Sequence, residues 1–427
     1  PVRSALLIVE SPHKAETIAR FFGRPGRRRV GPLICHEVTT GDYLLNIVAS
    51  KGHVFDLVED RGYYGVRVDH QRKRFLPIYD TIKKCRSCGH QFVSFNAEND
   101  DKVCPKCNGK DIDDASERLL ALRSLAMEVD TIFLATDPDR EGEKIAWDIG
   151  MYLSPFACDI KRLEFHEVTR SAILKALQSP RNIDDNLVNA QIVRRVDDRW
   201  IGFELSKRLW KRFGSINLSA GRVQTPVLGW IIKRFEDYRG SWRYVLSLLL
   251  DNGYTLNIDD IGVGDRKVIS RGLRGRKIAI KDIDEYEREV TPPPPYTTDE
   301  MLTDASRLLN ISPSETMALA QTLFESGYIT YHRSDSRHVS DDGIRIAQKY
   351  IADTFSPNEF VARKWAAREM GPHECIRPTR PISPKELTDM IRETGEERLG
   401  DKGIKLYGMI FRRFMASEMK AARVIYQ

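Results

Sequence analysis

The stretch Thr131-Ile-Phe-Leu-Ala-Thr136, followed at once by Asp137-Pro-Asp139-Arg-Glu141-Gly142-Glu143, decides the fold of this chain. The apolar run is typical of a buried strand, and a helix is predicted from residue 142 to residue 152. Acidic residues at alternating positions therefore follow the carboxyl end of a strand, where open α/β sheets bind their ligands. Clustered carboxylates stay ionised together when a cation or water shields them, and oxygen ligands favour Mg²⁺. The segment predicts a magnesium site, with a solvated acidic turn as the alternative.

The composition indicates a soluble protein of two to four domains, because 427 residues exceed what one compact core supports. The 67 basic residues exceed the 61 acidic ones, and the net charge of +6 permits a polyanionic partner without demonstrating one. Magnesium beside a basic surface suggests phosphodiester chemistry. No apolar run approaches the ~20 residues of a membrane helix, and residues 5–9 are too short a run for a signal peptide. We expect a cytoplasmic protein with no membrane partner.

Four of the seven cysteines have the spacing of a zinc ribbon. Cys85 and Cys88 form one pair, Cys104 and Cys107 form another, and 15 residues separate the pairs. Two such knuckles bring four thiolates into a tetrahedron, as structural zinc requires. Disulfides are the alternative, but they are rare inside cells. The spacing predicts a small ribbon over about 82–112 that its metal folds.

Strands and helices alternate over the first part of the chain, which favours a parallel sheet covered on both faces. Strands are predicted over 4–10, 44–50, 130–136 and 162–165, and helices over 14–22, 115–129, 142–152 and, capped by Thr169, as far as 177. Long helices follow over 186–213 and 219–238, then a strand over 242–252 and small β segments over 254–290. The run Pro292–Pro295 indicates an extended linker, and further helices are predicted over 298–309, 313–325, 341–355, 384–393 and 403–419.

Glu10 is expected beside the acidic residues Asp137, Asp139 and Glu141, because each group ends a strand of one sheet. Up to four carboxylates would then meet at one rim. Lys14 follows Glu10 by one helical turn, where it could balance this charge or hold a phosphate. A solvated helix lysine is the alternative for Lys14.

The segment from Gly327 to Ser336 contains Tyr331 with Arg333 two residues further on. A phenol has a pKa of ~10 and is a weak nucleophile near neutral pH, but nearby cationic charge favours the phenolate. A tyrosine nucleophile would give a covalent phosphotyrosine that conserves the energy of the broken bond. The alternative is a tyrosine whose ring lies in a core. A third polar motif begins at His373, although a lone histidine is more often structural.

Basic residues also gather on the two long helices after Pro180. Arg194, Arg195 and Arg199 share one helix with Asp198, which lies four residues after Arg194 and on the same face. This helix forms either a phosphate-binding ridge or a solvated face of ion pairs. Arg222 follows small residues at the start of the next helix, and helix starts attract anions such as DNA phosphates.

The order of these motifs resembles that of the type IA DNA topoisomerases over essentially the whole chain. The matching motifs are Ile8 to Ala15, Ser50 to Asp56, Ala135 to Gly142, Arg194 to Arg199, Leu218 to Thr225, Gly327 to Ser336 and His373 to Thr379. Within this family the chain most resembles the topoisomerase half of reverse gyrases. The inserted zinc ribbon and the segment Phe21-Phe-Gly-Arg-Pro25 carry this narrower resemblance.

The resemblance implies a multidomain α/β plus α fold in which four domains form a ring. A Toprim domain, which is Rossmann-like and shared with bacterial primases, would span 1–165 and contain the zinc ribbon. A helical DNA-binding gate domain would span 166–240, a β-rich arch 241–291 and a helical cap 292–407. Residues 408–427 would begin the return into the arch, so we expect an incomplete ring.

The resemblance also assigns roles to single residues. Tyr331 would be the nucleophile and Arg333 the cation at the scissile phosphate, with Glu10, Lys14 and His373 beside them. Mg²⁺ would be bound by Glu10, Asp137, Asp139 and Glu141, and structural zinc by Cys85, Cys88, Cys104 and Cys107. Residues that contact DNA or order the site would be His53, Asp56, Arg162, Arg194, Arg195, Asp198, Arg222, Gln321, Glu325, Thr330 and Asp335.

The implied activity is transient cleavage of single-stranded DNA, passage of another strand and resealing, by a monomer. In reverse gyrases a helicase-like ATPase half precedes this region, and the present sequence has no Gly-x4-Gly-Lys-Ser/Thr loop. We therefore expect ATP to be used by a half outside this chain, which acts in cis or in trans. The alternatives are a stand-alone relaxing or decatenating topoisomerase, a Toprim nuclease or primase, and a zinc-ribbon DNA-binding scaffold.

Overall fold

The computed structural model describes residues 2–93, 103–157, 159–241, 245–259, 266–279, 281–365, 373–394 and 397–426. Within these residues the chain forms two compact units. The first joins Pro1–Arg194 to Glu289–Ala422, and the second joins Arg195–Arg288 to Arg423–Gln427. The expected sheet domain and cap therefore belong to one unit, which also contains Tyr331 and the acidic residues. Each unit is described by itself.

A six-stranded sheet with the order β13-β12-β1-β4-β3-β2 forms the centre of the first unit. Its strands are β1 (Arg3–Val9), β2 (Gly26–Val30), β3 (Leu33–Thr39), β4 (Tyr43–Ala49), β12 (Thr131–Leu134) and β13 (Asp159–Arg162). β12 and β4 flank β1 in parallel, with Leu7 paired to Phe133 and to Ile47, whereas β2 and β3 are antiparallel. The neighbours β1 and β12 therefore end at the same edge of the sheet, as predicted.

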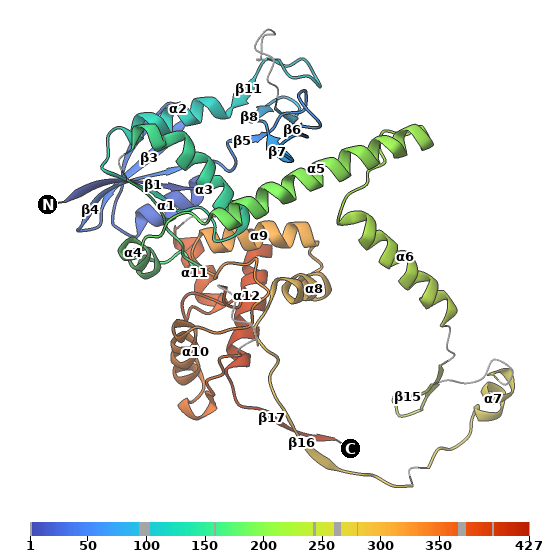
Figure 1. Ribbon diagram of the computed structural model, residues 1–427. Coiled ribbons are helices and arrows are strands. Elements are labelled where there is room, and N and C mark those ends of the chain that lie inside the picture. The colour runs from blue at the N-terminus through green and yellow to red at the C-terminus, as the bar shows by residue number, and fades with distance from the viewer. Residues whose placement is uncertain are drawn as a thin grey trace. The chain divides into compact units, whose positions relative to one another are not determined.

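Helices cover both faces of the sheet, as the alternating pattern predicted (Figure 1). The apolar cluster on one face includes residues of α2 (Ala115–Ala126) and α3 (Arg140–Leu153), which the short helix η1 (Ser154–Phe156) follows. The cluster on the other face includes residues of α1 (Pro12–Arg20) and α4 (Arg170–Gln178). Thr169 caps α4, because its side chain accepts a hydrogen bond from the Ala172 amide at 3.2 Å.

The connection between β4 and α2 holds short antiparallel strands. β5 (Phe55–Leu57) pairs with β8 (Tyr79–Thr81), and β6 (Val66–Asp69) pairs with β7 (Arg74–Pro77) in a hairpin. The predicted ribbon contains β9 (Lys83–Cys85) between β10 (Gln91–Phe92) and β11 (Ile112–Asp114). Residues 94–102 of this ribbon lie outside the described residues.

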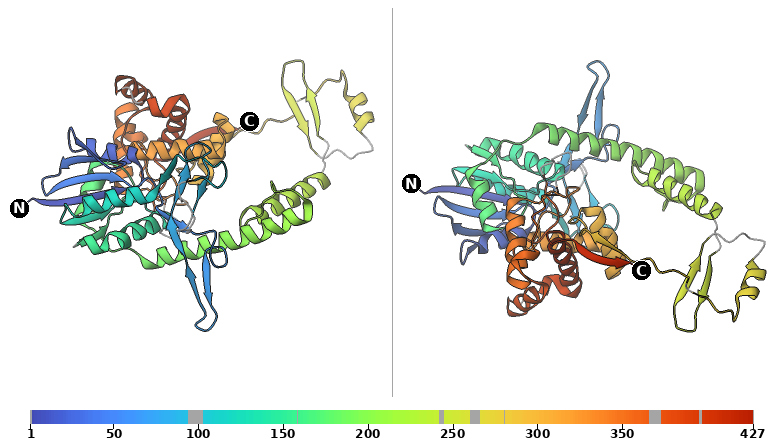
Figure 2. Two further views of the ribbon diagram at one scale, coloured as in Figure 1. Left: turned by 90° about the horizontal axis from the view of Figure 1, so that it is seen from above. Right: turned by 90° about the horizontal axis from the view of Figure 1, so that it is seen from below.

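The cap consists of helices that pack beside the sheet domain (Figure 2). Its elements are α8 (Thr298–Leu309), α9 (Pro313–Glu325), α10 (Asp341–Thr354), η2 (Pro357–Glu359), α11 (Pro384–Thr394), η3 (Glu397–Leu399) and α12 (Gly400–Ser417). Phe324, Ile329 and Tyr331 of the cap share one apolar cluster with Leu7, Ile18 and Phe165 of the sheet domain. A continuous core therefore joins the two parts, which the sequence pattern presented as separate domains.

The second unit contains most of α5 (Asp185–Phe213) together with α6 (Gln224–Gly240). β14 (Leu246–Leu249) pairs with β15 (Thr255–Ile258), and β16 (Tyr286–Val290) pairs with β17 (Ala422–Tyr426). The helix α7 (Arg266–Leu273) lies where small β segments were predicted, so that interpretation was wrong for these eight residues. Among the described helices, none is both long and apolar enough to cross a membrane.

Two further differences concern the sheet. The fourth predicted strand, residues 162–165, is displaced, because β13 spans Asp159–Arg162. The hairpin of β2 and β3 was missed, since its first strand is the charged sequence Gly-Arg-Arg-Arg-Val and lacks a buried apolar run. The pairing of Arg29 with Ile34 and of Arg27 with His36 adds this hairpin to the sheet beyond β4.

Candidate active site at the sheet edge

Three chain segments meet at the carboxyl ends of β1 and β12: Glu10 to Lys14, the acidic loop Asp137 to Glu143, and the tyrosine segment Gly327 to Arg333. All three belong to the first unit. They bring the phenol of Tyr331 to the predicted acidic residues, because the Tyr331 hydroxyl donates a hydrogen bond of 2.5 Å to Asp139 Oδ2.

The tyrosine segment is fixed by backbone contacts with the residues that follow β13. Gly327 has φ +74°, and a Cβ atom there would lie 2.3 Å from the carbonyl oxygen of Val168, so only glycine fits. The Tyr331 amide donates to the His166 carbonyl at 2.8 Å, and Thr330 forms a β-bridge with Glu167. On its other side, the Thr330 amide donates to the Arg377 carbonyl at 2.9 Å. These contacts hold the tyrosine at the sheet edge.

The acidic loop turns tightly into α3. A Cβ atom at Gly142 would lie 2.1 Å from the Asp137 carbonyl oxygen, so the loop requires glycine at this position. Asp139 is the N-cap of α3, and its Oδ1 accepts a hydrogen bond of 2.8 Å from the Gly142 amide. Asp139 thus uses one oxygen to begin the helix and the other to bind the Tyr331 hydroxyl.

Arg162 fixes the acidic loop by hydrogen bonds to its backbone carbonyl oxygens. Its side chain is 0% exposed and donates to the carbonyl oxygens of Leu134 and Thr136 at 3.0 Å and of Asp137 at 2.8 Å. It also pairs with buried Glu143 at 3.0 Å. The predicted role of Arg162 was to contact DNA or to order the site, and these contacts of the fully buried side chain order the acidic loop.

Glu10, Asp137 and Lys14 form the buried side of the site. Glu10 Oε1 accepts from the Asp137 amide at 2.9 Å, and Lys14 Nζ donates to Asp137 Oδ1 at 2.9 Å. Burial, followed by the negative charge of Asp137, raises the pKa of Glu10 to about 7. Burial acts to raise the pKa of Asp137 too, but Lys14 and hydrogen bonds outweigh it and lower that pKa. The two neighbouring carboxyl groups therefore differ in protonation near neutral pH.

Arg333 and His53 form the exposed side of the site. Arg333 lies 3.2 Å from Asp139 Oδ2 and 3.5 Å from Glu141 Oε2. His53 lies 3.2 Å from the other Glu141 oxygen, and this hydrogen bond lowers the pKa of Glu141. Arg333 is 45% exposed at its side chain, so it is the cation of the site that solvent or a ligand reaches.

Tyr331 itself is closed off, with only 2% of its surface exposed. Its ring packs against Phe324 and His332, with centroids 5.2 and 5.5 Å away. Burial and then the charges of Asp139 and Asp137 raise the pKa of Tyr331 above its ordinary value. The hydroxyl faces the carboxylates and not an apolar interior, but a phosphate reaches it only after the tyrosine segment and the sheet edge separate.

The donor set at this edge suits a hard cation, because it consists of carboxylate oxygens from Glu10, Asp137, Asp139 and Glu141. In this structure Lys14, Tyr331 and Arg333 bind these oxygens. Among the described residues, only the four cysteines bring three or more potential ligands close enough together for one ion. The carboxylate oxygens of these residues are therefore of the type that magnesium prefers. In this structure they contact protein groups and do not converge on one point.

The sulfur atoms of Cys85, Cys88, Cys104 and Cys107 lie within 4.8 Å of one another, with Cys85 to Cys107 and Cys88 to Cys104 at 3.6 Å. Tetrahedral zinc with Zn–S bonds of about 2.3 Å separates its sulfurs by about 3.8 Å, so the cluster fits this ion. A Cβ atom at Gly109 would lie 3.3 Å from the Cys107 sulfur and 3.4 Å from the Cys85 sulfur. The knuckle thus wraps closely around the thiolates.

Other predicted residues surround the tyrosine. Gln321 donates to Glu325 at 2.8 Å and to Asp137 at 3.4 Å. Buried Thr330 donates to the Cys375 carbonyl at 2.7 Å, which is an ordering contact. His373 lies 3.3 Å from His166, and its ring centroid is 5.8 Å from that of Tyr331.

The remaining predicted DNA contacts are divided between the two units. Asp56 is buried and accepts from the Leu57 amide at 2.8 Å, Asp335 is exposed, and Arg194 is one of the charges that lower the pKa of Glu141. Arg195, Asp198 and Arg222 belong to the second unit, where Arg222 donates to Asp198 at 2.9 Å.

Sequence reasoning missed two histidines and one ion-pair network. His166 supplies the carbonyl that fixes Tyr331, and His332 is fully buried with no hydrogen-bond partner on either ring nitrogen in the described part of the chain. Arg181 bridges Glu143 at 2.7 Å and Glu164 at 2.5 Å. Glu143 stands in the quoted acidic segment, which was the available signal, whereas His166 has no local signature.

Comparisons with known proteins identify the family of this chain. The family model described as DNA topoisomerase matches residues 182–427, and the Toprim domain model matches residues 5–168. The reverse gyrase of Pyrococcus furiosus is 52% identical over 431 residues, which cover 100% of this chain and 34% of that protein. Reverse gyrase 2 of Aquifex aeolicus is 47% identical and covers 99% of this chain and 36% of that protein. The chain thus spans about a third of the length of these relatives.

A solved structure gives the same result for the fold. Full-length topoisomerase I from Thermotoga maritima superposes with a TM-score of 0.69 and 26% sequence identity, covering 98% of this chain and 62% of that one. The resemblance inferred from the ordered motifs is therefore confirmed. The chain belongs to the type IA DNA topoisomerase family and is similar to the topoisomerase part of reverse gyrases.

Proposed function

We propose that this chain is the DNA-cleaving module of a type IA topoisomerase that acts as part of a reverse gyrase. It cuts one DNA strand, permits another to pass and reseals the cut. One observation carries the proposal: the Tyr331 hydroxyl lies 2.5 Å from Asp139 Oδ2, with Arg333 3.2 Å from the same oxygen. A nucleophile, a proton acceptor and a cation for the phosphate thus occupy one edge of the sheet.

Cleavage follows from the protonation states of these groups. The Tyr331 oxygen attacks the phosphorus and loses its proton to Asp139, the carboxylate that already accepts its hydrogen bond. The bond from phosphorus to the 3′ oxygen breaks, and Glu10 donates a proton to that oxygen, since its pKa of about 7 keeps part of it protonated at neutral pH. The products are a 5′-phosphotyrosine and a free 3′ hydroxyl. Resealing reverses each transfer, so cleavage itself needs no ATP.

Bound metals complete the module. Mg²⁺ held by oxygens of Asp137, Asp139 and Glu141, and of Glu10 once it has given up its proton, would supply positive charge beside the phosphate and the 3′ end. Lys14 neutralises buried Asp137 and so prevents the carboxylates from repelling one another. Zinc held by the four cysteines would fold the ribbon and take no part in the chemistry.

The reaction also requires the cap to move. Tyr331 is 2% exposed, and the hydrogen bond from its amide to the His166 carbonyl holds its segment closed. Entry of a single strand would separate this segment from the sheet edge, and passage of a second strand would require a wider opening. Single-stranded DNA is the proposed substrate, because a single strand requires a smaller separation of the tyrosine segment from the sheet edge than a duplex does.

The complete activity is proposed to include a helicase-like ATPase half, supplied in cis or in trans. Both relatives named above are reverse gyrases about three times as long as the matched region. With that half, the proposed activity is ATP-driven positive supercoiling by a cytoplasmic monomer. A stand-alone relaxing or decatenating topoisomerase is the second candidate, favoured by the similarity to topoisomerase I of Thermotoga maritima.

The experiment mixes the chain with 5′-labelled and 3′-labelled single-stranded oligonucleotides and analyses them on a denaturing gel. We expect protein attached to the 5′ phosphate of the 3′ fragment, and none with Tyr331→Phe, which should still bind the DNA. Tyr350→Phe on α10, whose ring packs against Phe411, is the matched control and should form the adduct. Cleavage without attached protein would indicate a Toprim nuclease and overturn the proposal.

A further inference from the structure

A pocket of about 320 Å³ lies beside the candidate active site, between the sheet domain and the cap. Its wall includes the first turns of α1, Arg27 of β2, His36 of β3, Lys51 just after β4 and Arg398 of η3. No catalytic role proposed above uses these residues. The pocket is therefore a separate feature of the first unit.

The pocket is positively charged. Its lining has three cations, Arg27, Lys51 and Arg398, against the single carboxylate of Glu16, which leaves a formal excess of two positive charges. That carboxylate is already shared, because Arg27 and Arg20 each lie 2.8 Å from Glu16 Oε1 and Arg398 lies 3.6 Å from Oε2. One carboxylate cannot satisfy this many donors, so the pocket favours an anion.

His36 supplies an independent sign of a ligand. Its side chain is only 6% exposed, it lines the pocket, and its Nδ1 has no hydrogen-bond partner among the described residues. Buried polar atoms are nearly always paired, so an unpaired one calls for an explanation. The start of α1 at Pro12 and His13 forms part of the same wall, and helix starts attract anions.

The pocket adjoins the catalytic centre through the chain itself. The Lys51 amide donates to the carbonyl oxygen of Glu10 at 2.8 Å. Helix α1 carries both Lys14, which binds Asp137 at 2.9 Å, and His13, which accepts from Arg398 at 2.5 Å. The pocket and the catalytic centre therefore share α1 and the backbone contact between Glu10 and Lys51.

We propose that this pocket binds one backbone phosphate of the DNA strand next to the phosphate that Tyr331 attacks. The phosphate oxygens would accept hydrogen bonds from His36 Nδ1–H and from the guanidinium groups of Arg27 and Arg398. The proposal rests on the proposed function and adds a positioning site to it. A DNA strand whose phosphate is bound in this pocket keeps its position along the sheet edge while the cut is open.

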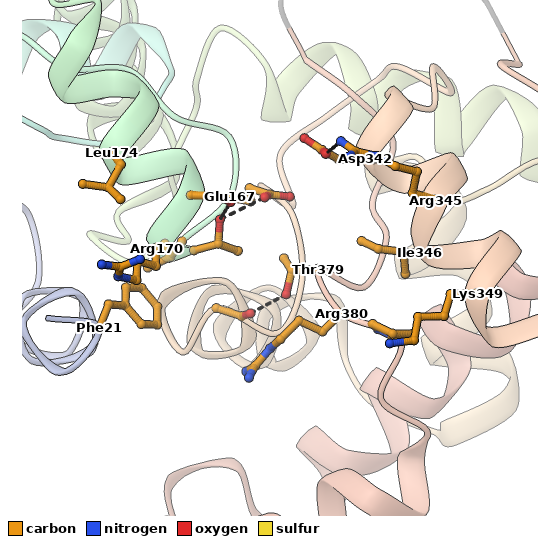
Figure 3. Close-up of a pocket in the computed structure, with 15 residues that line it drawn as sticks. Phe21, Glu167, Arg170, Leu174, Asp342, Arg345, Ile346, Lys349, Thr379 and Arg380 are labelled. Carbon is orange, nitrogen blue, oxygen red and sulfur yellow. Dashed lines mark hydrogen bonds and ion pairs between the residues drawn. The ribbon is translucent and has the colours of Figure 1, made fainter. Parts of the chain in front are cut away.

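A second, larger groove differs from the pocket in how its charges and its buried polar atoms are paired. It has a cavity volume of about 710 Å³ and lies beside the tyrosine segment, with Arg170 of α4 on one side and Arg345 and Lys349 of α10 on the other (Figure 3). Arg345 pairs with Asp342 within that groove. None of its described lining residues has a buried side-chain atom without a partner. It therefore supplies a matched control, Lys349→Gln, for the loss of one positive charge.

The test measures binding of single-stranded oligonucleotides by fluorescence anisotropy in the Tyr331→Phe background, where no adduct forms. Each oligonucleotide carries one neutral methylphosphonate, and the position is moved along the strand. We expect one position at which the neutral linkage weakens binding about tenfold, the effect of losing hydrogen bonds to a charged group. In the His36→Leu and Arg27→Gln proteins, a methylphosphonate at that position should no longer weaken binding. In the Lys349→Gln protein it should weaken binding as it does in the parent. An unchanged pattern in both pocket variants would overturn the proposal.

Two further measurements distinguish loss of DNA binding from a folding defect and from binding of a free phosphate. His36→Leu should unfold at or above the parent's temperature, because it removes an unpaired buried polar group, so weaker DNA binding is not a folding defect. In protein labelled with ¹⁵N-histidine, the His36 ring resonances should shift on adding the oligonucleotide. A shift with inorganic pyrophosphate but none with the oligonucleotide would assign the pocket to a free phosphate and overturn the DNA site. Failure of the intact chain to form an adduct, with a His36-dependent methylphosphonate pattern, would overturn the proposed function alone.

Discussion

The Tyr331 hydroxyl donates a 2.5 Å hydrogen bond to Asp139 Oδ2, while Oδ1 of the same carboxylate accepts from the first turn of α3. One side chain therefore begins a helix of the sheet domain and receives the phenol of the cap. Because the helix cap fixes the carboxylate, its second oxygen has one direction available. The position of the nucleophile is thereby coupled to the fold of the acidic loop.

Asp139→Asn should separate the capping role from the chemical one. Asparagine also caps helices well, so the unfolding temperature should change little. The amide is a much weaker proton acceptor than the carboxylate, so the rate of adduct formation on a single-stranded oligonucleotide should fall about 10²- to 10⁴-fold. Single-turnover gels measure this rate.

Asp139→Ala is the comparison variant for this prediction. It should lose the same activity and in addition about 1 kcal/mol of stability, because the Gly142 amide loses its acceptor. If Asp139→Asn cleaves as fast as the parent, the carboxylate does not accept the proton of Tyr331, and the proposed transfer is wrong.

The sequence predicted this edge of the sheet because its signals are local. An apolar run followed by alternating carboxylates identifies a strand and its end, and Thr169 was recognised as a helix cap from its type and position. The parallel pairing of β1 with β12 then places Glu10 beside Asp137, as their strand ends implied. The Tyr331 role came from the family resemblance, since composition alone favoured a core tyrosine.

The contacts that complete the site were beyond local reasoning, because they join residues far apart in the chain. Arg162 was predicted to contact DNA or to order the site, and its ordering contacts are with carbonyls 25 or more residues earlier. Nothing in the local sequence around Gly327 indicates the carbonyl of Val168, which lies against it in the fold. The hairpin of β2 and β3 carries few buried residues on its first strand, so no period-two apolar pattern marked it.

Cleavage should depend on the protonation of Glu10. Its pKa is raised to about 7, chiefly by burial and by Asp137, and the proposed donor is the protonated form. The cleavage rate should therefore be highest below pH 7 and fall about fivefold between pH 7 and pH 8. Single-turnover adduct formation between pH 5.5 and pH 8.5 measures this profile.

The raised pKa of Glu10 also makes the stability of the folded protein depend on pH. Folded Glu10 binds its proton more tightly than unfolded Glu10, whose ordinary pKa is 4.5. The stabilisation of the folded state by this bound proton is fully present below pH 4.5 and is lost as pH rises through about 7. The free energy of unfolding falls by about 3 kcal/mol at most over this range. Glu10→Gln should remove this dependence and melt above the parent at pH 8. Identical pH profiles of melting for parent and variant would contradict the assignment.

Gly142→Ala should disrupt the acidic loop. The added methyl group would lie 2.1 Å from the Asp137 carbonyl, which no small adjustment relieves. We expect a loss of at least about 3 kcal/mol of stability together with loss of adduct formation. Gly229→Ala on α6 is the matched control, because nothing lies within 4 Å of its added methyl group. That variant should gain up to about 1 kcal/mol from helix propensity, as thermal melts can measure.

Removal of the ribbon's metal should unfold the ribbon and spare the sheet. Cys88→Ser removes one of four thiolates, whereas Lys106→Ala, between Cys104 and Cys107 of the other knuckle, preserves all four and is the control. Hydrogen exchange should increase over β9 and β11 in the cysteine variant, but not over β1 and β12, which the continuous apolar clusters bury. Zinc content measured by elemental analysis should fall from one ion per chain in the same variant. If β1 and β12 exchange as fast as the ribbon, the metal site supports the whole sheet domain, and the ribbon is not an autonomous insert.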